Sequence, residues 1–260
     1  MTTWVLLRGL MRESRHWGDF PHQLQKVVPN EDIVCIDFPG NGPLNQLHSL
    51  TSIPAMADYC RQHLLTLGIK PPFHVLAISL GAMVAVAWAE SFPDELKSLT
   101  LINTSLAPHN PFYHRLRPKN YPRLVRSILF GNRQKREALI LQLTSQMTDK
   151  KCASTLIDQW VHYAREYPIS RANILRQLRA ASQFKAPEQA PMAAILMLAS
   201  RQDQLVNFHC SQTLADKWQV SLRIHEQAGH DLPLDDGQWV ITAIQEWRRD
   251  VFGDKDFDVA

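Results

Sequence analysis

The sequence predicts a domain of the α/β class, with a mostly parallel sheet, helices on both of its faces and one inserted helical segment. Short apolar runs alternate with helical patterns at intervals of roughly 15–30 residues, which is typical of βαβ units. The alternation stops after residue 102, where roughly 85 residues show helical periodicity and no clear strand. This inserted stretch also differs from the rest of the chain in charge.

Six segments of four to six residues, most of them apolar and bounded by turn-forming or polar residues, predict the strands. They are residues 4–7, 33–36, 73–78, 99–102, 194–199 and 220–225. Apolar residues at helical spacing predict helices around the sheet at 19–28, 53–67, 81–92, 211–218 and 240–252. Further helices are expected in the inserted segment at 124–129, 138–147, 153–167 and 172–184.

The composition is that of a packed globular protein of 260 residues, with 45% hydrophobic and 20% charged residues. The first twenty residues hold five charged side chains, and no run of eighteen apolar residues occurs, so we expect neither a signal peptide nor a membrane partner. The four cysteines are scattered, which indicates neither a metal site nor a redox motif. We therefore expect a cytoplasmic protein that needs no cofactor.

Basic residues are concentrated in the inserted segment. Residues 105–187 include 15 Lys or Arg and 4 Asp or Glu, a net charge of +11, whereas the remaining residues carry a net charge of −8. We therefore predict an α/β core at residues 1–104 and 188–260 and a basic helical lid at residues 105–187. The lid charge fits solvated helix faces, and it also fits an anionic substrate or an acidic carrier protein. Nucleic acid is not an expected partner, because the basic residues are interspersed with apolar ones and no nucleic-acid motif is present.

A candidate nucleophile follows the third predicted strand, in Ala77-Ile78-Ser79-Leu80-Gly81. A nucleophile at a sharp turn from a strand into a helix needs small residues two positions before and after it, and Ala77 and Gly81 meet this need. Ser79 is therefore the predicted nucleophile. The alternative is that its hydroxyl only caps the helix that follows.

A serine hydroxyl needs a base, and the base needs a carboxylate on its other ring nitrogen. His230 lies between the last predicted strand and the closing helix, from where its ring can reach the carboxyl edge of the sheet. Asp203 follows the fifth predicted strand and gives the chain order Ser, Asp, His. The competing carboxylates are Asp37, Asp231, Asp235 and Asp236.

Acyl transfer also needs hydrogen-bond donors for the oxyanion. The backbone N–H of Leu80 follows the nucleophile directly, and the N–H of Leu10 is the best donor in the loop after the first strand, where Gly9 permits a close approach. Arg8 and Met11 of this loop are candidate substrate-binding residues. The Arg8 guanidinium can bind a substrate carboxylate or pair with an acidic side chain of the protein.

Together these motifs resemble the α/β-hydrolase superfamily over nearly the full chain. The resembling segments are the Arg-Gly loop after the first strand, Phe-Pro-Gly-Asn-Gly at 38–42, Ala-x-Ser-x-Gly at 77–81, Asp-Gln-Leu-Val at 203–206 and Ala-Gly-His at 228–230. The chain looks most like small bacterial carboxylesterases of the pimeloyl-[acyl carrier protein] methyl ester esterase type, and like the related carbon–carbon hydrolases and lyases.

The resemblance implies a Ser79, Asp203 and His230 triad with oxyanion donors at Leu10 and Leu80. The chain departs from the family pattern in three respects. An arginine stands at position 8, where the family usually has histidine, and an alanine at position 77 replaces glycine. The first predicted strand begins close to the start of the sequence, so we expect the sheet to lack the two outermost strands that are common in the family.

The favoured function is hydrolysis of a carboxylic ester or thioester through an acyl-enzyme on Ser79. One alternative is a carbon–carbon bond hydrolase or lyase that uses the same triad, and another is a ligand-binding protein without catalysis. The aromatic residues of the lid that can line a pocket or belong to its core are Phe112, Tyr113, Phe130, Trp160 and Tyr163.

Overall fold

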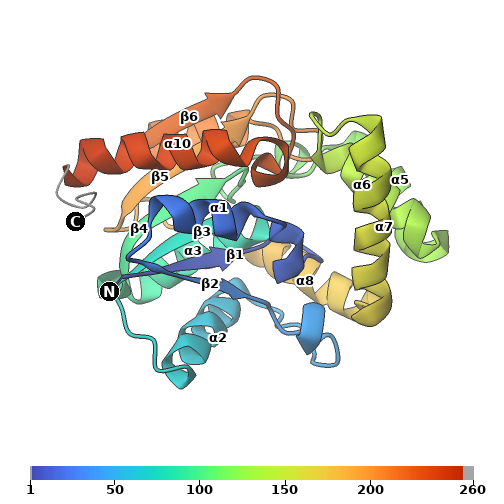
Figure 1. Cartoon of the computed structure of the whole chain (residues 1–260), viewed down its shortest axis with the longest axis horizontal. Coiled ribbons are helices and arrows are strands. Elements are labelled where there is room, and N and C mark those ends of the chain that lie inside the picture. Colours follow the sequence, from blue (N-terminus) through green and yellow to red (C-terminus); the bar gives the residue numbers. More distant parts are fainter. Residues whose placement is uncertain (1, 254–260) are drawn as a thin grey trace.

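The computed structural model describes residues 2–253 and contains a six-stranded sheet, in the order β2-β1-β3-β4-β5-β6, whose strands all run parallel (Figure 1). The strands are β1 (Thr3–Leu7), β2 (Asp32–Ile36), β3 (Phe73–Ile78), β4 (Leu96–Ile102), β5 (Ala194–Ser200) and β6 (Ser221–His225). This confirms the predicted α/β class and all six predicted strands, each within three residues at either end. Residue 1 and residues 254–260 of the predicted core lie outside the described residues.

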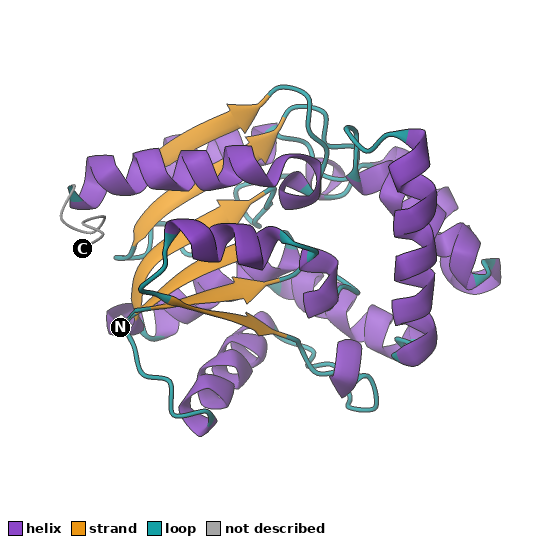
Figure 2. Cartoon of the chain, viewed as in Figure 1, coloured by secondary structure: helices purple, strands orange, loops and turns teal. Residues whose placement is uncertain are grey.

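Helices cover both faces of the sheet (Figure 2). Helices α1 (Phe20–Val27) and α10 (Leu232–Phe252) pack on one face and contact each other. Helices α2 (Ile53–Thr66), α3 (Leu80–Ser91) and α9 (His209–Trp218) pack on the other face. The central strands β1 and β3 are buried along their whole length, which explains why their sequences are mostly apolar, whereas the edge strands β2 and β6 are only partly buried.

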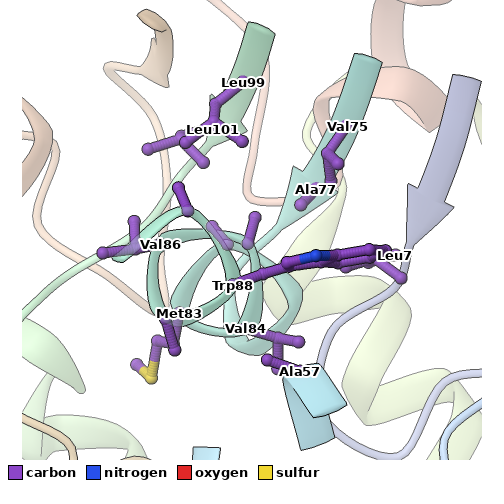
Figure 3. Packing of buried hydrophobic residues seen from close by; sticks show 14 of the residues in the cluster. Leu7, Ala57, Val75, Ala77, Met83, Val84, Val86, Trp88, Leu99 and Leu101 are labelled. Atoms are coloured by element: carbon purple, nitrogen blue, oxygen red, sulfur yellow. The ribbon is translucent and has the colours of Figure 1, made fainter. Parts of the chain in front are cut away.

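Helix α3 is the centre of the core, because every residue from Leu80 to Ala89 is buried. A helix that is apolar on all sides must be surrounded by other elements. Its Val84 lies beside Ala57 of α2, and its Trp88 extends towards Leu7 of β1 (Figure 3). This packing fixes the start of α3 relative to the ends of the central strands.

The inserted segment contains α4 (Phe112–Arg115), α5 (Tyr121–Phe130), α6 (Arg133–Thr144), α7 (Lys150–Glu166) and α8 (Arg171–Gln183). Figure 1 shows α5, α6 and α7 beyond the strand ends at which the arrows point. Four of these helices were predicted, and the single turn of α4 was not. The division into a core and a separate lid stays a prediction, since the helices alone do not define an independent unit.

The closing helix is longer than predicted, because α10 starts at Leu232 and the sequence pattern placed its start at residue 240. The backbone of Asp236 has non-helical angles (φ −150°, ψ 75°) and produces a kink inside α10. Pro233 is compatible with the first turn of a helix. The kink interrupts the apolar periodicity, so the first two turns had no helical pattern in the sequence.

Candidate active site

Ser79 joins β3 directly to α3 with φ 56° and ψ −114°, a conformation that is strained for a residue other than glycine. Its N–H extends the sheet by donating a hydrogen bond to the Ile102 carbonyl (3.0 Å). Although Ser79 occupies the N-cap position of α3, its hydroxyl forms no capping hydrogen bond. The geometry therefore favours a nucleophile presented on a tight turn over a helix cap.

Two glycines permit the close contacts around this turn. A Cβ atom at Gly81 would lie 2.5 Å from the carbonyl oxygen of Leu7 and 2.7 Å from that of Arg8, so α3 can approach the end of β1 only with glycine there. A Cβ atom at Gly9 would lie 3.2 Å from Ser79 Cβ and 3.8 Å from Ser79 Oγ. The loop after β1 therefore lies directly against the candidate nucleophile.

Asp203 and His230 form a buried pair at the ends of β5 and β6. The distance from His230 Nδ1 to Asp203 Oδ2 is 2.6 Å, and the other carboxylate oxygen accepts the N–H groups of Leu205 (2.7 Å) and Val206 (2.9 Å). An ionised carboxylate only accepts hydrogen bonds, so Nδ1 carries the proton of the neutral ring. Nε2 is then the ring nitrogen that can accept a proton.

The competing carboxylates have other partners. Asp37 accepts hydrogen bonds from Ser14, Asp235 from Gly229 and Ser145, Asp236 from Trp239, and Asp231 from Arg8. Among these five carboxylates, only Asp203 is hydrogen-bonded to the His230 ring.

The pKa of His230 is raised above its ordinary value of 6.5 by the balance of three effects. Burial of the ring opposes protonation, but the charge of Asp203 and its hydrogen bond favour the protonated form and together prevail. Asp231 raises this pKa further, while Arg8 lowers it. The environment therefore strengthens His230 as a base.

Arg8 forms a bidentate ion pair with Asp231, with nitrogen–oxygen distances of 3.0 Å and 2.5 Å. Both side chains are buried, with 4% and 5% exposed, and the guanidinium also lies 4.7 Å from the centre of the Trp17 ring. The sequence left open whether the Arg8 guanidinium binds a substrate carboxylate or pairs with an acidic side chain of the protein. In the structure it pairs with Asp231. A contact of Arg8 with substrate stays a prediction.

Most of the predicted site residues border one cavity of about 460 Å³. They are Arg8, Leu10, Met11, Ser79, Leu80 and His230, while Asp203 lies behind the histidine. Ser79 and His230 both border this cavity, but in the described structure Ser79 Oγ forms no hydrogen bond with the His230 ring. Such bonds are often long in free enzymes and shorten when substrate binds.

The loop after β1 has a free amide at the position predicted for an oxyanion donor. The N–H of Met11 is occupied by a hydrogen bond to Gln177 Oε1 (3.0 Å), and the N–H of Arg12 donates to the carbonyl of Gly9 (3.2 Å). Within the described chain, the N–H of Leu10 forms no hydrogen bond, so it is available to a ligand. The N–H of Leu80 is in the first turn of α3, where helices leave such donors unpaired.

Helices of the inserted segment supply the apolar wall of the cavity. This wall includes Phe112, Leu124, Val125, Ile128, Ile140 and Leu178. Of the five lid aromatics considered from the sequence, only Phe112 borders this cavity. Trp160 is buried elsewhere, and Tyr163 borders a second cavity.

Asn103 is a site residue that the sequence analysis did not identify as functional. Its Nδ2 donates to the carbonyl oxygens of His230 (2.8 Å) and Gly229 (3.2 Å), and its Oδ1 accepts the N–H of Ser200 (2.8 Å). It therefore ties the histidine loop to the end of β5. The only sequence signal was its place directly after β4, at the carboxyl edge of the sheet.

Residues 2–253 contain no group of three or more His, Cys, Asp or Glu side chains arranged to hold a metal ion. No helix within the same residues has the length and apolar character that crossing a membrane requires. All four cysteines are unpaired.

The fold and the residues around this cavity define a hydrolase of the α/β class. The chain matches the alpha/beta hydrolase family over residues 4–243 and belongs to that family.

Named relatives are similar to the chain at low identity. Monoacylglycerol lipase ABHD6 of Mus musculus is 23% identical over 244 residues, which cover 89% of this chain and 70% of that protein. Pimeloyl-[acyl-carrier protein] methyl ester esterase of Chromobacterium violaceum is 31% identical over 101 residues, which cover 39% of this chain and 36% of that enzyme.

Solved structures of esterases share the fold. A thermophilic esterase from Thermogutta terrifontis has a TM-score of 0.77 at 20% identity, covering 96% of this chain and 90% of that chain. The esterase EaEST from Exiguobacterium antarcticum also has a TM-score of 0.77, at 13% identity, with coverage of 95% and 91%.

Proposed function

We propose that this protein hydrolyses a carboxylic ester or thioester through an acyl-enzyme on Ser79. The observation that carries the proposal is the buried Asp203–His230 hydrogen bond (2.6 Å) beside a cavity onto which a strained serine also opens. A protein that only binds a ligand has no need for this combination. Hydrolase activity in general is supported by membership of the family.

The reaction proceeds in two acyl transfers. Ser79 Oγ attacks the carbonyl carbon while Nε2 of His230 takes its proton, and the amides of Leu10 and Leu80 donate to the oxyanion. The carbon–oxygen or carbon–sulfur bond then breaks, and His230 gives its proton to the leaving group. Water, deprotonated by His230, attacks the acyl-enzyme, and the acid is released as Ser79 recovers its proton.

The cavity supports an acyl group with an apolar chain. Its volume of about 460 Å³ is within the usual range for small-molecule sites, and its lid wall is apolar. Two guanidinium groups, those of Arg115 and Arg136, also border it, and neither has a carboxylate partner among the described residues. We therefore extend the proposal to substrates that carry a negative charge, either on the small molecule or on an acidic carrier.

The test is a panel of p-nitrophenyl esters of increasing chain length, with and without a terminal carboxylate, and an acyl-carrier thioester. Wild type should hydrolyse some members, and Ser79→Ala should lose at least about 10³-fold in kcat. Arg136→Gln should weaken only hydrolysis of the charged esters. Equal rates for wild type and Ser79→Ala would reject the proposal.

The same panel tests the alternatives. A fluorophosphonate adduct on Ser79 without turnover of any ester would favour the carbon–carbon hydrolase or lyase. Retention of a small molecule without turnover would favour a binding protein. A cytoplasmic location remains a prediction, which fractionation of cells that express the protein would test.

A further inference from the structure

Gln177 of α8 connects the inserted segment to the loop that holds the predicted oxyanion donor. Its side chain is fully buried (0% exposed), and a buried amide requires hydrogen-bond partners. Its Oε1 accepts the N–H of Met11 (3.0 Å), and its Nε2 donates to Asn41 Oδ1 (2.7 Å) and Ser49 Oγ (3.0 Å). These bonds join α8 to two loops at the carboxyl edge of the sheet.

The turn from Gly9 to Arg12 needs such support. It is closed by the bond from the N–H of Arg12 to the carbonyl of Gly9 (3.2 Å), and Met11 at its third position has φ 63°. This position normally holds glycine or asparagine, because a larger side chain is strained there. Gln177 holds the N–H of Met11, and Asn41 Nδ2 holds the carbonyl of Arg12 (2.9 Å), so the turn is fixed at two adjacent residues.

The held turn determines where the Leu10 amide points. The Leu10 N–H belongs to the same peptide unit as the Gly9 carbonyl, and this carbonyl accepts the Arg12 N–H, so the closed turn fixes the direction of the Leu10 N–H. Rotation of the next peptide unit, Leu10–Met11, would relieve the unfavourable φ of Met11, but it would break the bond to Gln177 and loosen the turn. We propose that Gln177 is a positioning residue, which keeps the Leu10 N–H directed at the developing oxyanion. This inference rests on the proposed function, because it assumes that the Leu10 amide stabilises an oxyanion.

Asn173 provides a matched control on the same helix. It lies one turn before Gln177, is 2% exposed, accepts the N–H of Ser49 (3.0 Å) and donates to the carbonyl of Leu47 (2.9 Å). It therefore attaches α8 to a neighbouring loop without touching the turn at residues 9–12. Asn173→Leu and Gln177→Met each remove a buried amide of α8, but only Gln177→Met releases the turn.

The kinetic test compares these variants on an ester that wild type hydrolyses. Gln177→Met should lower kcat by about 10–100-fold with KM within about threefold, because misplacing an oxyanion donor weakens binding of the transition state only. Asn173→Leu should keep kcat within about threefold. Adding Asn41→Ala to Gln177→Met should cost no more than the larger single change, since both act on one turn. Equal losses of kcat in Gln177→Met and Asn173→Leu, or a change confined to KM, would overturn the proposal.

Hydrogen exchange of the Met11 amide, followed by NMR, tests the same inference without any substrate. Exchange should be at least about tenfold faster in Gln177→Met than in wild type or Asn173→Leu, because the amide loses its acceptor. The same exchange rate in both variants would overturn the proposal. If wild type hydrolyses no ester, the proposed function fails, and Met11 exchange still decides whether Gln177 holds the turn.

Discussion

The buried Arg8–Asp231 pair allows a quantitative prediction about the site. Each partner is about one-twentieth exposed, so removal of one leaves the other as an uncompensated charge inside the protein. Such losses cost about 3–5 kcal/mol of unfolding free energy. Asp231 is at the start of α10, where the helix end stabilises a carboxylate by up to about 1 kcal/mol. Arg8→Met should therefore cost about 3 kcal/mol and Asp231→Leu about 4 kcal/mol.

The double variant Arg8→Met/Asp231→Leu should be more stable than either single variant, because no buried charge is left without a partner. The assay is urea unfolding at pH 7 for all four proteins. The pH dependence of kcat/KM gives a second readout, since Arg8 lowers and Asp231 raises the pKa of His230. The acid limb should move to higher pH in Arg8→Met and to lower pH in Asp231→Leu. Costs below about 1 kcal/mol that simply add in the double variant would refute the reasoning.

Two further predictions concern the histidine and the close-contact glycines. Because the pKa of His230 is raised above 6.5 and the ring must be neutral to act as base, kcat/KM should rise with pH and reach half its maximum above pH 6.5. Asp203→Asn should move that midpoint to lower pH and reduce kcat by about 10³–10⁴-fold, and an unchanged profile in this variant would contradict the assignment. Gly81→Ala should destabilise the fold by about 2–3 kcal/mol in urea, because its Cβ would overlap two carbonyl oxygens. Gly9→Ala should cost less than about 1 kcal/mol of unfolding free energy but lower kcat at least tenfold, because its Cβ would lie against Ser79. A larger loss of stability in Gly9→Ala than in Gly81→Ala would contradict the described packing.

Features with a strong local signal were predictable from the sequence. The central strands β1 and β3 are mostly apolar because they are buried on both faces, and this pattern needs no long-range information. The turn at Ser79 was predictable because small residues must flank it, and Gly81 meets two carbonyl oxygens, as this requirement implies. The pairing of Asp203 with His230 followed from their chain order and from the place of each residue directly after a predicted strand.

Contacts between distant parts of the chain were not predictable in this way. The choice of Asp231 as partner of Arg8 depends on two loops that are 223 residues apart in sequence. Gln177 lies 166 residues from the turn that it holds. One signal was present, because Gln177 is a polar residue on the apolar face of α8, between Ile174 and Leu178. A buried polar residue on such a face needs partners, but the sequence does not say which.

The central claim is that Ser79 is the nucleophile, and covalent labelling tests it most directly. Wild-type protein treated with a fluorophosphonate probe and analysed by mass spectrometry should carry one adduct per chain, located on Ser79, with loss of ester hydrolysis in proportion to labelling. His230→Ala should label far more slowly, since the base that activates the hydroxyl is gone. An adduct on another residue, or equal labelling of Ser79→Ala, would contradict the account.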